Sequence, residues 1–181
     1  EPQNTIEPVT QIAEEASSDA HPIELNIDPK RHEEIRSSYK DEQDKENERR
    51  IRMVVEYIHF YMPRIADEET VNHVCNEVSN WMNKNNYKPK PIKRRLTQDI
   101  SNIPLRHFIW NIAERCMYKR YYNGDNRARF VKELFPREFS ETDIATIKNF
   151  KVDPLKSPIP IDEPEDGKPD FHYPNGYLRK E

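Results

Sequence analysis

Six cationic side chains stand within twelve residues in the middle of the chain, with no acidic residue among them. They are Lys84, Lys88, Lys90, Lys93, Arg94 and Arg95, with Tyr87 inside the run and Trp81 just before it. Cations neutralise phosphates and release counterions, while aromatic rings can stack on exposed bases. The segment is therefore a candidate nucleic-acid contact. The competing interpretation is a solvated basic link in which Tyr87 and Trp81 simply belong to the core.

A second basic cluster follows, and it too is interleaved with tyrosines. It comprises Arg115, Lys119, Arg120, Arg127, Arg129 and Lys132, with Tyr118 and Tyr122 between them. A basic, aromatic and helical surface is typical of many DNA-binding domains. We expect nucleic acid to be contacted by the 84–95 segment, including Tyr87, together with the face that carries Arg115, Lys119 and Arg120.

The chain shows no residue pattern typical of catalysis or metal binding. The sequence contains no glycine-rich phosphate loop, no GxSxG elbow and no HExxH motif. It also lacks a CxxC pair, and His73 with Cys75 alone is too little for a zinc site. Catalysis needs at least two groups brought together with shifted pKa values, and no pattern here indicates such a pair. We expect a protein that is not an enzyme and has no cofactor or bound metal.

The net charge of −4 is unevenly distributed along the chain. Residues 1–45 hold 12 acidic and 5 basic side chains, a net charge of −7. Residues 46–150 hold 14 acidic and 19 basic (+5), and residues 151–181 hold 7 acidic and 5 basic (−2). An acidic flank beside a basic domain could compete with a polyanion for the same cations. We therefore expect residues 1–45 to weaken nucleic-acid binding.

Apolar residues recur with the 3.6-residue period of a helix between about residues 48 and 150. The apolar stripes of the expected helices lie within 51–62, 71–82, 92–100, 104–122, 130–135 and 144–150. The short helix with the 92–100 stripe is expected to begin near Pro91. The 104–122 segment carries two adjacent apolar stripes, which is typical of a central helix with neighbours on two sides. Because no useful alternation of period two is present, we expect an all-α fold: a single compact bundle of five or six helices.

Polar residues before these stripes predict where the helices begin. Expected N-caps are Asp28 (with Pro29 in the first turn), Asp67, Asp125, and Ser140 with Asp143 in the capping-box position. Asn123 and Gly124 are expected to end the long helix. Residues 30–50 hold almost nothing apolar beyond Ile35 and Tyr39, so a helix there would be exposed and marginal without a partner.

These observations divide the chain into three parts. Residues 1–45 are expected to be an acidic, mostly disordered tail with an exposed helix from 29, and residues 46–150 the basic helical domain. Residues 151–181, rich in proline, are expected to be extended. Three aromatic residues lie within 171–177. They favour either a loose terminus or a strap that packs on the chain's own surface or on a partner.

Composition limits the location of the protein. The mean hydropathy is −1.08, and no run approaches the roughly 20 apolar residues that span a bilayer. Cys75 and Cys116 both lie on apolar stripes, where a thiol behaves as a small buried hydrophobe. We expect a soluble, intracellular, cytoplasmic protein in a reducing compartment, with no membrane association.

Two segments carry a resemblance to known proteins. Leu105–Ala113 (LRHFIWNIA) and Phe130–Pro136 (FVKELFP) resemble small helical proteins carried on bacterial mobile elements. The resemblance implies DNA-related regulation and assigns no role to any residue.

The sequence thus predicts a non-catalytic helical binding protein that associates with DNA or RNA through a basic surface, in a DNA-binding or regulatory role. The alternative is an accessory subunit of a larger assembly, held to a protein partner through residues 1–45 and 151–181.

Overall fold

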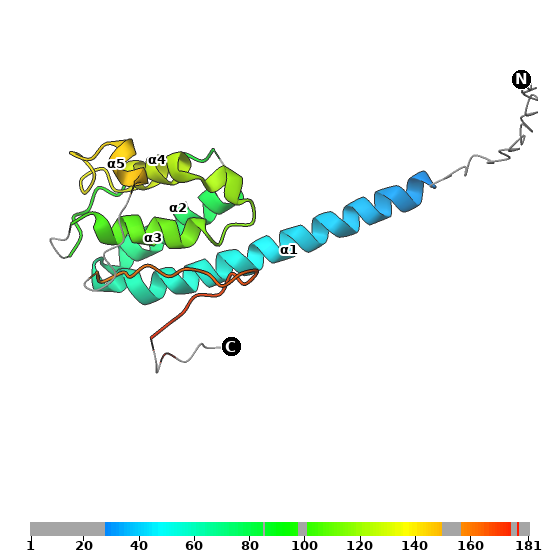
Figure 1. Ribbon diagram of the computed structural model, residues 1–181, viewed down its shortest axis with the longest axis horizontal. Helices are drawn as coiled ribbons and strands as arrows, with labels where there is room; N and C mark the ends of the chain where they lie inside the picture. The colour runs from blue at the N-terminus through cyan, green and yellow to red at the C-terminus, as the bar shows by residue number, and fades with distance from the viewer. Residues whose placement is uncertain (1–27, 85, 98–100, 150–156, 175–176, 178–181) are drawn as a thin grey trace, which may run out of the picture. The chain divides into compact units, whose positions relative to one another are not determined.

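The structure is a computed structural model that describes residues 28–84, 86–97, 101–149, 157–174 and 177. Within these ranges all regular secondary structure is helical, with five α-helices, two short 3-10 helices and no strand. The elements are α1 (Pro29–Tyr61), η1 (Met62–Arg64), α2 (Glu68–Asn83), α3 (Ile103–Ala113), η2 (Lys119–Tyr122), α4 (Gly124–Leu134) and α5 (Ile144–Lys148), labelled in Figure 1. The predicted all-α class is confirmed.

Helix α1 begins where the sequence predicts and is longer than its apolar stripe. The Lys30 backbone N–H donates to Asp28 Oδ1 at 3.0 Å, and Pro29 is the first helical residue, so the predicted cap is confirmed. Every residue from 29 to 42 is exposed, and full burial begins only at Met53. The chain divides after Ser37 into two units by contact, and the unit 38–181 contains the hydrophobic core.

The core is built from the predicted helical stripes. Its buried side chains include Val54, Tyr57 and Ile58 of α1, Val74, Val78 and Trp81 of α2, and Leu105, Phe108 and Ile112 of α3. Trp81 stacks on Phe130 of α4 with ring centroids 4.3 Å apart. Asp67 caps α2 as predicted, because its Oδ1 accepts the Thr70 N–H at 2.8 Å.

The helix expected at 92–100 is absent from residues 91–97, which are irregular. Ile92 and Leu96 are nevertheless buried, at 4% and 5% exposure. The Ile92 N–H donates to Leu134 O and the Thr97 N–H to Ile65 O, both at 2.8 Å. Pro89 and Pro91 disfavour helical conformation at Lys88 and Lys90. Beyond them the backbone N–H groups of Ile92 and Thr97 bond to distant segments in place of helical hydrogen bonds. Residues 98–100 lie outside the described ranges.

The prediction of one long helix at 104–122 is also wrong, because α3 ends at Ala113. The following turn tightens, and the Arg115 N–H donates to Ile112 O at 3.0 Å. Asn123 begins α4 instead of ending α3, since its Oδ1 accepts the Asn126 N–H at 3.0 Å. Asp125, the predicted cap, lies in the first turn. A Cβ on Gly124 would lie 2.8 Å from Lys148 Cγ, so glycine permits this close approach.

Helix α5 has a different cap from the predicted one. Asp143 is the N-cap, and its Oδ1 accepts the Thr146 N–H at 2.7 Å. Ser140 lies in the preceding turn and does not cap the helix. Serine and aspartate are both favoured N-cap residues, so the local sequence does not determine which of the two caps the helix.

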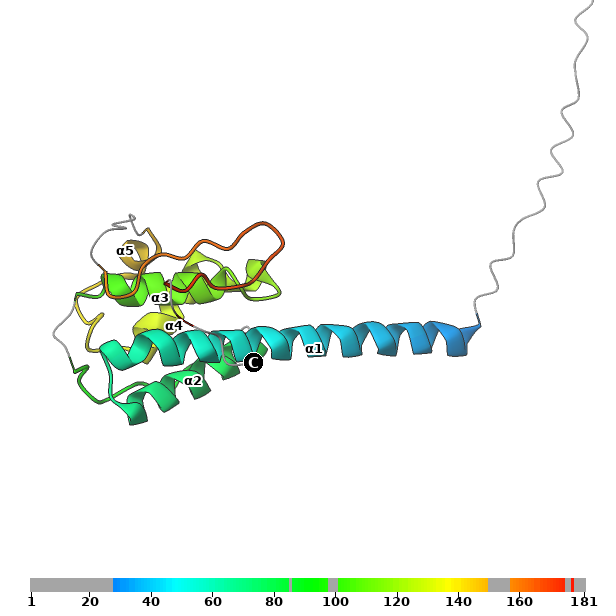
Figure 2. The same cartoon turned by 90° about the horizontal axis from the view of Figure 1, so that it is seen from below.

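The C-terminal segment 157–174 is irregular, as predicted, and it packs on the helical domain. It runs along α3 and the C-terminal half of α1 (Figures 1 and 2). His107 Nδ1 donates to Ile159 O at 2.9 Å, and Asn111 Nδ2 donates to Pro160 O at 2.9 Å. Phe171 stacks on Tyr57 with centroids 4.2 Å apart. This segment is therefore a strap on the chain's own surface, one of the two interpretations left open by its aromatic residues.

Candidate nucleic-acid interface

The cations of the predicted basic segment are exposed, and three of them line two separate hollows. After α2 the chain crosses in extended form to the end of α4, which distributes its cations over separate hollows. Lys88 lines a hollow with α4, whereas Lys93 and Arg94 line another with His73 of α2. Lys84, Lys90 and Arg95 are exposed as well. The segment therefore contributes cations to two hollows of the surface.

Arg94 is held by carboxylates at the start of α2. Its Nη1 donates to Asp67 Oδ2 at 2.9 Å, and its Nη2 pairs with Glu69. Hydrogen bonds from Thr70, together with Arg94, lower the pKa of Asp67 to about 2. In contrast, no carboxylate in the described part of the chain lies within 4.0 Å of the ammonium groups of Lys84, Lys88, Lys90 or Lys93. Because its guanidinium is already paired, Arg94 is a poor phosphate ligand. The four lysines form no ion pair with the described residues.

Tyr87 positions the backbone next to Lys88. Its hydroxyl donates to Glu77 Oε2 at 2.8 Å, and the Lys90 N–H donates to the same oxygen at 2.8 Å. Glu77 is only 5% exposed, so these bonds replace water that the carboxylate has lost. Burial, followed by the Glu77 carboxylate, raises the pKa of Tyr87. Glu77 is therefore a buried acceptor that fixes the backbone of this segment.

Arg115 is not on the surface, which corrects its expected role. It is 1% exposed, and its Nη1 and Nη2 donate to Asp162 O and Asp162 Oδ1 at 2.8 and 2.9 Å. Its Cζ lies 3.9 Å above the ring of Phe171. Burial lowers the pKa of Arg115, and the charge of Asp162 acts in the opposite direction. The guanidinium anchors the strap and is not accessible to a phosphate.

Lys119 and Arg120, which were expected to contact nucleic acid together with Arg115, are exposed. Lys119 Nζ lies 3.1 Å from Glu114 Oε2, an ion pair on the surface. Arg120 Nη2 donates to Tyr121 Oη at 2.8 Å, and its Cζ lies 4.7 Å from the centre of the Tyr121 ring. The Arg120 guanidinium therefore contacts an aromatic residue.

One hollow brings residues of both basic clusters together, and we call it the cationic groove. Its volume is about 520 Å³, and it is lined by Asn86, Tyr87, Lys88, Arg120, Tyr121, Asn123, Asp125, Asn126, Arg129, Phe130 and Glu133. Three of these side chains are cationic and two are acidic, a net charge of +1. Asp125 is already paired with Lys148 Nζ at 3.0 Å. Lys88, Arg120 and Arg129 are thus available around two tyrosine rings.

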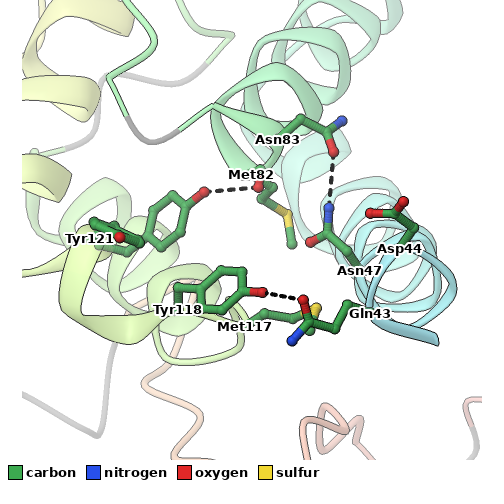
Figure 3. A pocket seen from close by; sticks show the side chains of 9 residues that line it. Gln43, Asp44, Asn47, Met82, Asn83, Met117, Tyr118 and Tyr121 are labelled. Carbon is green, nitrogen blue, oxygen red and sulfur yellow. Dashed lines mark hydrogen bonds between the residues drawn. The ribbon is translucent and has the colours of Figure 1, made fainter. Parts of the chain in front are cut away.

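A second hollow lies beside the first, and we call it the tyrosine pocket. Its volume is about 270 Å³, and it is lined by Gln43, Asp44, Asn47, Met82, Asn83, Met117, Tyr118, Tyr121 and Tyr122. Figure 3 shows Tyr118 donating to Gln43 Oε1 at 3.0 Å and Asn47 Nδ2 donating to Asn83 Oδ1 at 2.9 Å. Tyr122 Oη donates to Met82 O at 2.8 Å. Tyr121 lines both hollows, so they share a wall.

Sequence reasoning missed most of the tyrosine pocket. Gln43, Asn47 and Asn83 are polar residues of α1 and α2, and no local pattern distinguishes them from solvated surface. Residues 47 and 83 meet only through the packing of the two helices. Tyr118 and Tyr121 retain 44% and 38% exposure. A large half-exposed ring is a signal that only the tertiary structure provides.

The remaining chemistry-bearing groups do not form another site in the described ranges. Cys75 and Cys116 are both buried and free, as their stripe positions predicted, and burial raises the pKa of Cys75 to about 11. No group of three or more His, Cys, Asp or Glu residues is arranged there to hold a metal ion. None of the described helices combines the length and the apolar character needed to cross a membrane.

Comparisons of the chain with protein-family models, with curated proteins and with solved structures gave no match.

Proposed function

We propose that this protein binds single-stranded nucleic acid in the cationic groove, without catalysing a reaction. One observation supports this best: Lys88, Arg120 and Arg129 surround a single hollow whose lining also includes the half-buried Tyr87 and the 38% exposed Tyr121. Proteins that bind single strands combine a positive groove that follows the backbone with aromatic side chains on which bases stack. The groove has both components.

The cationic groove has enough positive charge to bind a few phosphates, and too little for the many phosphate contacts of a long duplex. Three cations that each neutralise one phosphate would give a slope of log affinity against log salt of roughly −2 on a single strand. The carboxylate of Glu133 in the same lining weakens the positive field. Binding is thus moderate and salt-sensitive, as in regulatory contacts that are reinforced by other parts of an assembly.

The test is fluorescence anisotropy of labelled single-stranded DNA and RNA of about 16 nucleotides, measured between about 50 and about 200 mM salt. Lys88→Glu and Arg129→Glu should each weaken binding by about tenfold or more, because reversal adds a repulsive charge to the groove. Lys93→Glu is the matched control, since it makes the same charge change at an exposed lysine in another hollow. Equal losses of affinity in all three variants would show that binding depends on the net charge of the protein and not on the cationic groove. No binding by the unaltered chain would refute the proposal.

A second candidate function, an accessory subunit of an assembly, is favoured by the exposed part of α1. Every residue from 29 to 42 is exposed, including Ile35 at 60% and Tyr39 at 62%, which lie one turn apart on one face. A helical stretch without buried apolar contacts is marginal in water, so a partner that covers this face would stabilise it. The strap 157–174 is already bound to its own chain, so docking through it would require its displacement.

Limited proteolysis tests the accessory-subunit candidate. Protection of residues 29–42 in a cell extract but not in buffer supports it, and equal cleavage of these residues in extract and in buffer opposes it.

A further inference from the structure

We propose that the tyrosine pocket receives one unpaired base of the strand whose phosphates lie in the cationic groove. The inference rests on the proposed function, and it adds a base-binding site with its own residues. The two hollows share Tyr121 as a wall, and Arg120, the adjacent residue, lines only the cationic groove. A strand that places a phosphate beside Arg120 therefore has the pocket within reach of a neighbouring base.

The lining of the tyrosine pocket excludes a phosphate as its occupant. It contains no lysine or arginine, and it contains the carboxylate of Asp44. An anion placed there would meet a like charge with no cation in the lining to compensate. The polar but uncharged groups around the pocket instead suit a neutral, hydrogen-bonding ring.

The carboxamides of the pocket retain donors and acceptors for such a ring. Gln43 uses its Oε1 to accept from Tyr118, which leaves its amino group. Asn47 donates its amino group to Asn83 Oδ1, which leaves Asn47 Oδ1 and the amino group of Asn83. Asparagine and glutamine side chains pair with base edges through this combination of an N–H donor and an oxygen acceptor. The internal bonds also hold the amides in place before a ligand arrives.

The tyrosines supply the stacking surface. Tyr118 and Tyr121 are 44% and 38% exposed, and their ring centroids lie 6.1 Å apart at an interplanar angle of 66°. The two rings meet edge to face, and the Arg120 guanidinium already lies 4.7 Å from the centre of the Tyr121 ring. The more exposed ring of Tyr118 is therefore the principal stacking surface for a base. The Tyr118 hydroxyl is bonded to Gln43, which fixes the ring at the rim of the pocket (Figure 3).

The experiment compares a single-stranded oligonucleotide with one of the same length in which abasic spacers replace the bases. Loss of the bases should weaken binding to the unaltered chain by at least about fivefold, because stacking in the tyrosine pocket and on the rings of the cationic groove is lost while the phosphates remain. Tyr118→Ala removes the stacking of one base only, so it should weaken binding of the normal oligonucleotide by about five- to a hundredfold and leave its salt dependence unchanged. It should have little effect on the abasic one. Gln43→Ala is a second variant of the same pocket, with a smaller loss expected.

Tyr39→Ala is the matched control, because Tyr39 is an exposed tyrosine of α1 outside the pocket lining. It should bind both oligonucleotides like the unaltered chain, and thermal unfolding should show that all variants fold. If the normal and abasic oligonucleotides bind equally well and Tyr118→Ala changes neither, the base pocket is wrong while the cationic groove stands. If neither oligonucleotide binds the unaltered chain, the proposed function fails and the base pocket fails with it.

Discussion

Arg115 and Asp162 form an ion pair from which water is almost fully excluded: their side chains are 1% and 5% exposed, and Arg115 Nη2 lies 2.9 Å from Asp162 Oδ1. The same carboxylate accepts the His172 N–H at 2.9 Å, and its Oδ1 lies 2.7 Å from His172 Nδ1. Asp162 thus joins the turn after α3 to both limbs of the strap. The pair determines where the C-terminal segment lies.

Replacing Asp162 should destabilise the protein strongly. Asp162→Asn leaves the Arg115 guanidinium buried without its counter-charge, a change that typically costs about 3–5 kcal/mol. Chemical denaturation of the full chain measures the loss of free energy of unfolding. Glu165→Gln is the control, because it removes a carboxylate of the same strap whose partner Lys168 is exposed. Similar midpoints for Asp162→Asn and the unaltered chain would show that the buried pair does not hold the strap.

Glu46 should contribute an acid-sensitive part of the stability. Hydrogen bonds from Arg49 and Arg50 lower the pKa of Glu46 from 4.5 to about 2. Because the folded pKa is the lower one, the stabilisation is present above pH 4.5 and is lost as the pH falls towards about 2. The pair is partly exposed, so screening reduces its contribution to ~1 kcal/mol or less.

The measurement for Glu46 is the free energy of unfolding as a function of pH. Glu46→Gln should flatten the curve between pH 4.5 and about 2. Glu48→Gln is the matched control, since Glu48 lies 3.8 Å from Arg52 on the same helix and both side chains are exposed. An unchanged curve for Glu46→Gln would contradict the assigned role.

Glu77 should be required for the conformation of the segment that carries Lys88. Glu77→Ala removes the acceptor of both the Tyr87 hydroxyl and the Lys90 N–H. Loss of hydrogen bonds to a charged group costs about 1.5–3 kcal/mol each when the partner cannot find water. Thermal unfolding should show the destabilisation, and amide exchange at Lys90 should accelerate. Glu133→Ala, an exposed change on α4, should leave this exchange unchanged.

Removing residues 1–27 should tighten nucleic-acid binding. These residues hold six acidic and no basic side chains, so a net charge of −6 would no longer compete for the groove. The deletion stops before α1, and therefore keeps Gln43 and Asn47 in the tyrosine pocket. Anisotropy at low salt should show a gain of severalfold that disappears at high salt. Unchanged affinity would remove the idea that the acidic flank shields the basic surface.

Local sequence patterns determined the helical class, the stripes of α1, α2 and α4, and the caps Asp28 and Asp67. These features depend on neighbours within one or two turns, so periodicity and capping chemistry specify them. The same reasoning failed at residues 91–97 and beyond Ala113, where the backbone bonds to distant segments or turns towards the strap. Local propensity is a weak guide when a distant partner determines the conformation.

Only the tertiary structure determines which cations are buried and which are accessible to a ligand. Arg115 and Arg120 stand five residues apart in one basic cluster, yet Arg115 is buried against Asp162, 47 residues away in the chain, while Arg120 lines the cationic groove. The sequence determined that positive charge is concentrated in the middle of the chain. A charge remains available to a ligand only if folding brings no carboxylate to it, and that depends on contacts between segments far apart in sequence.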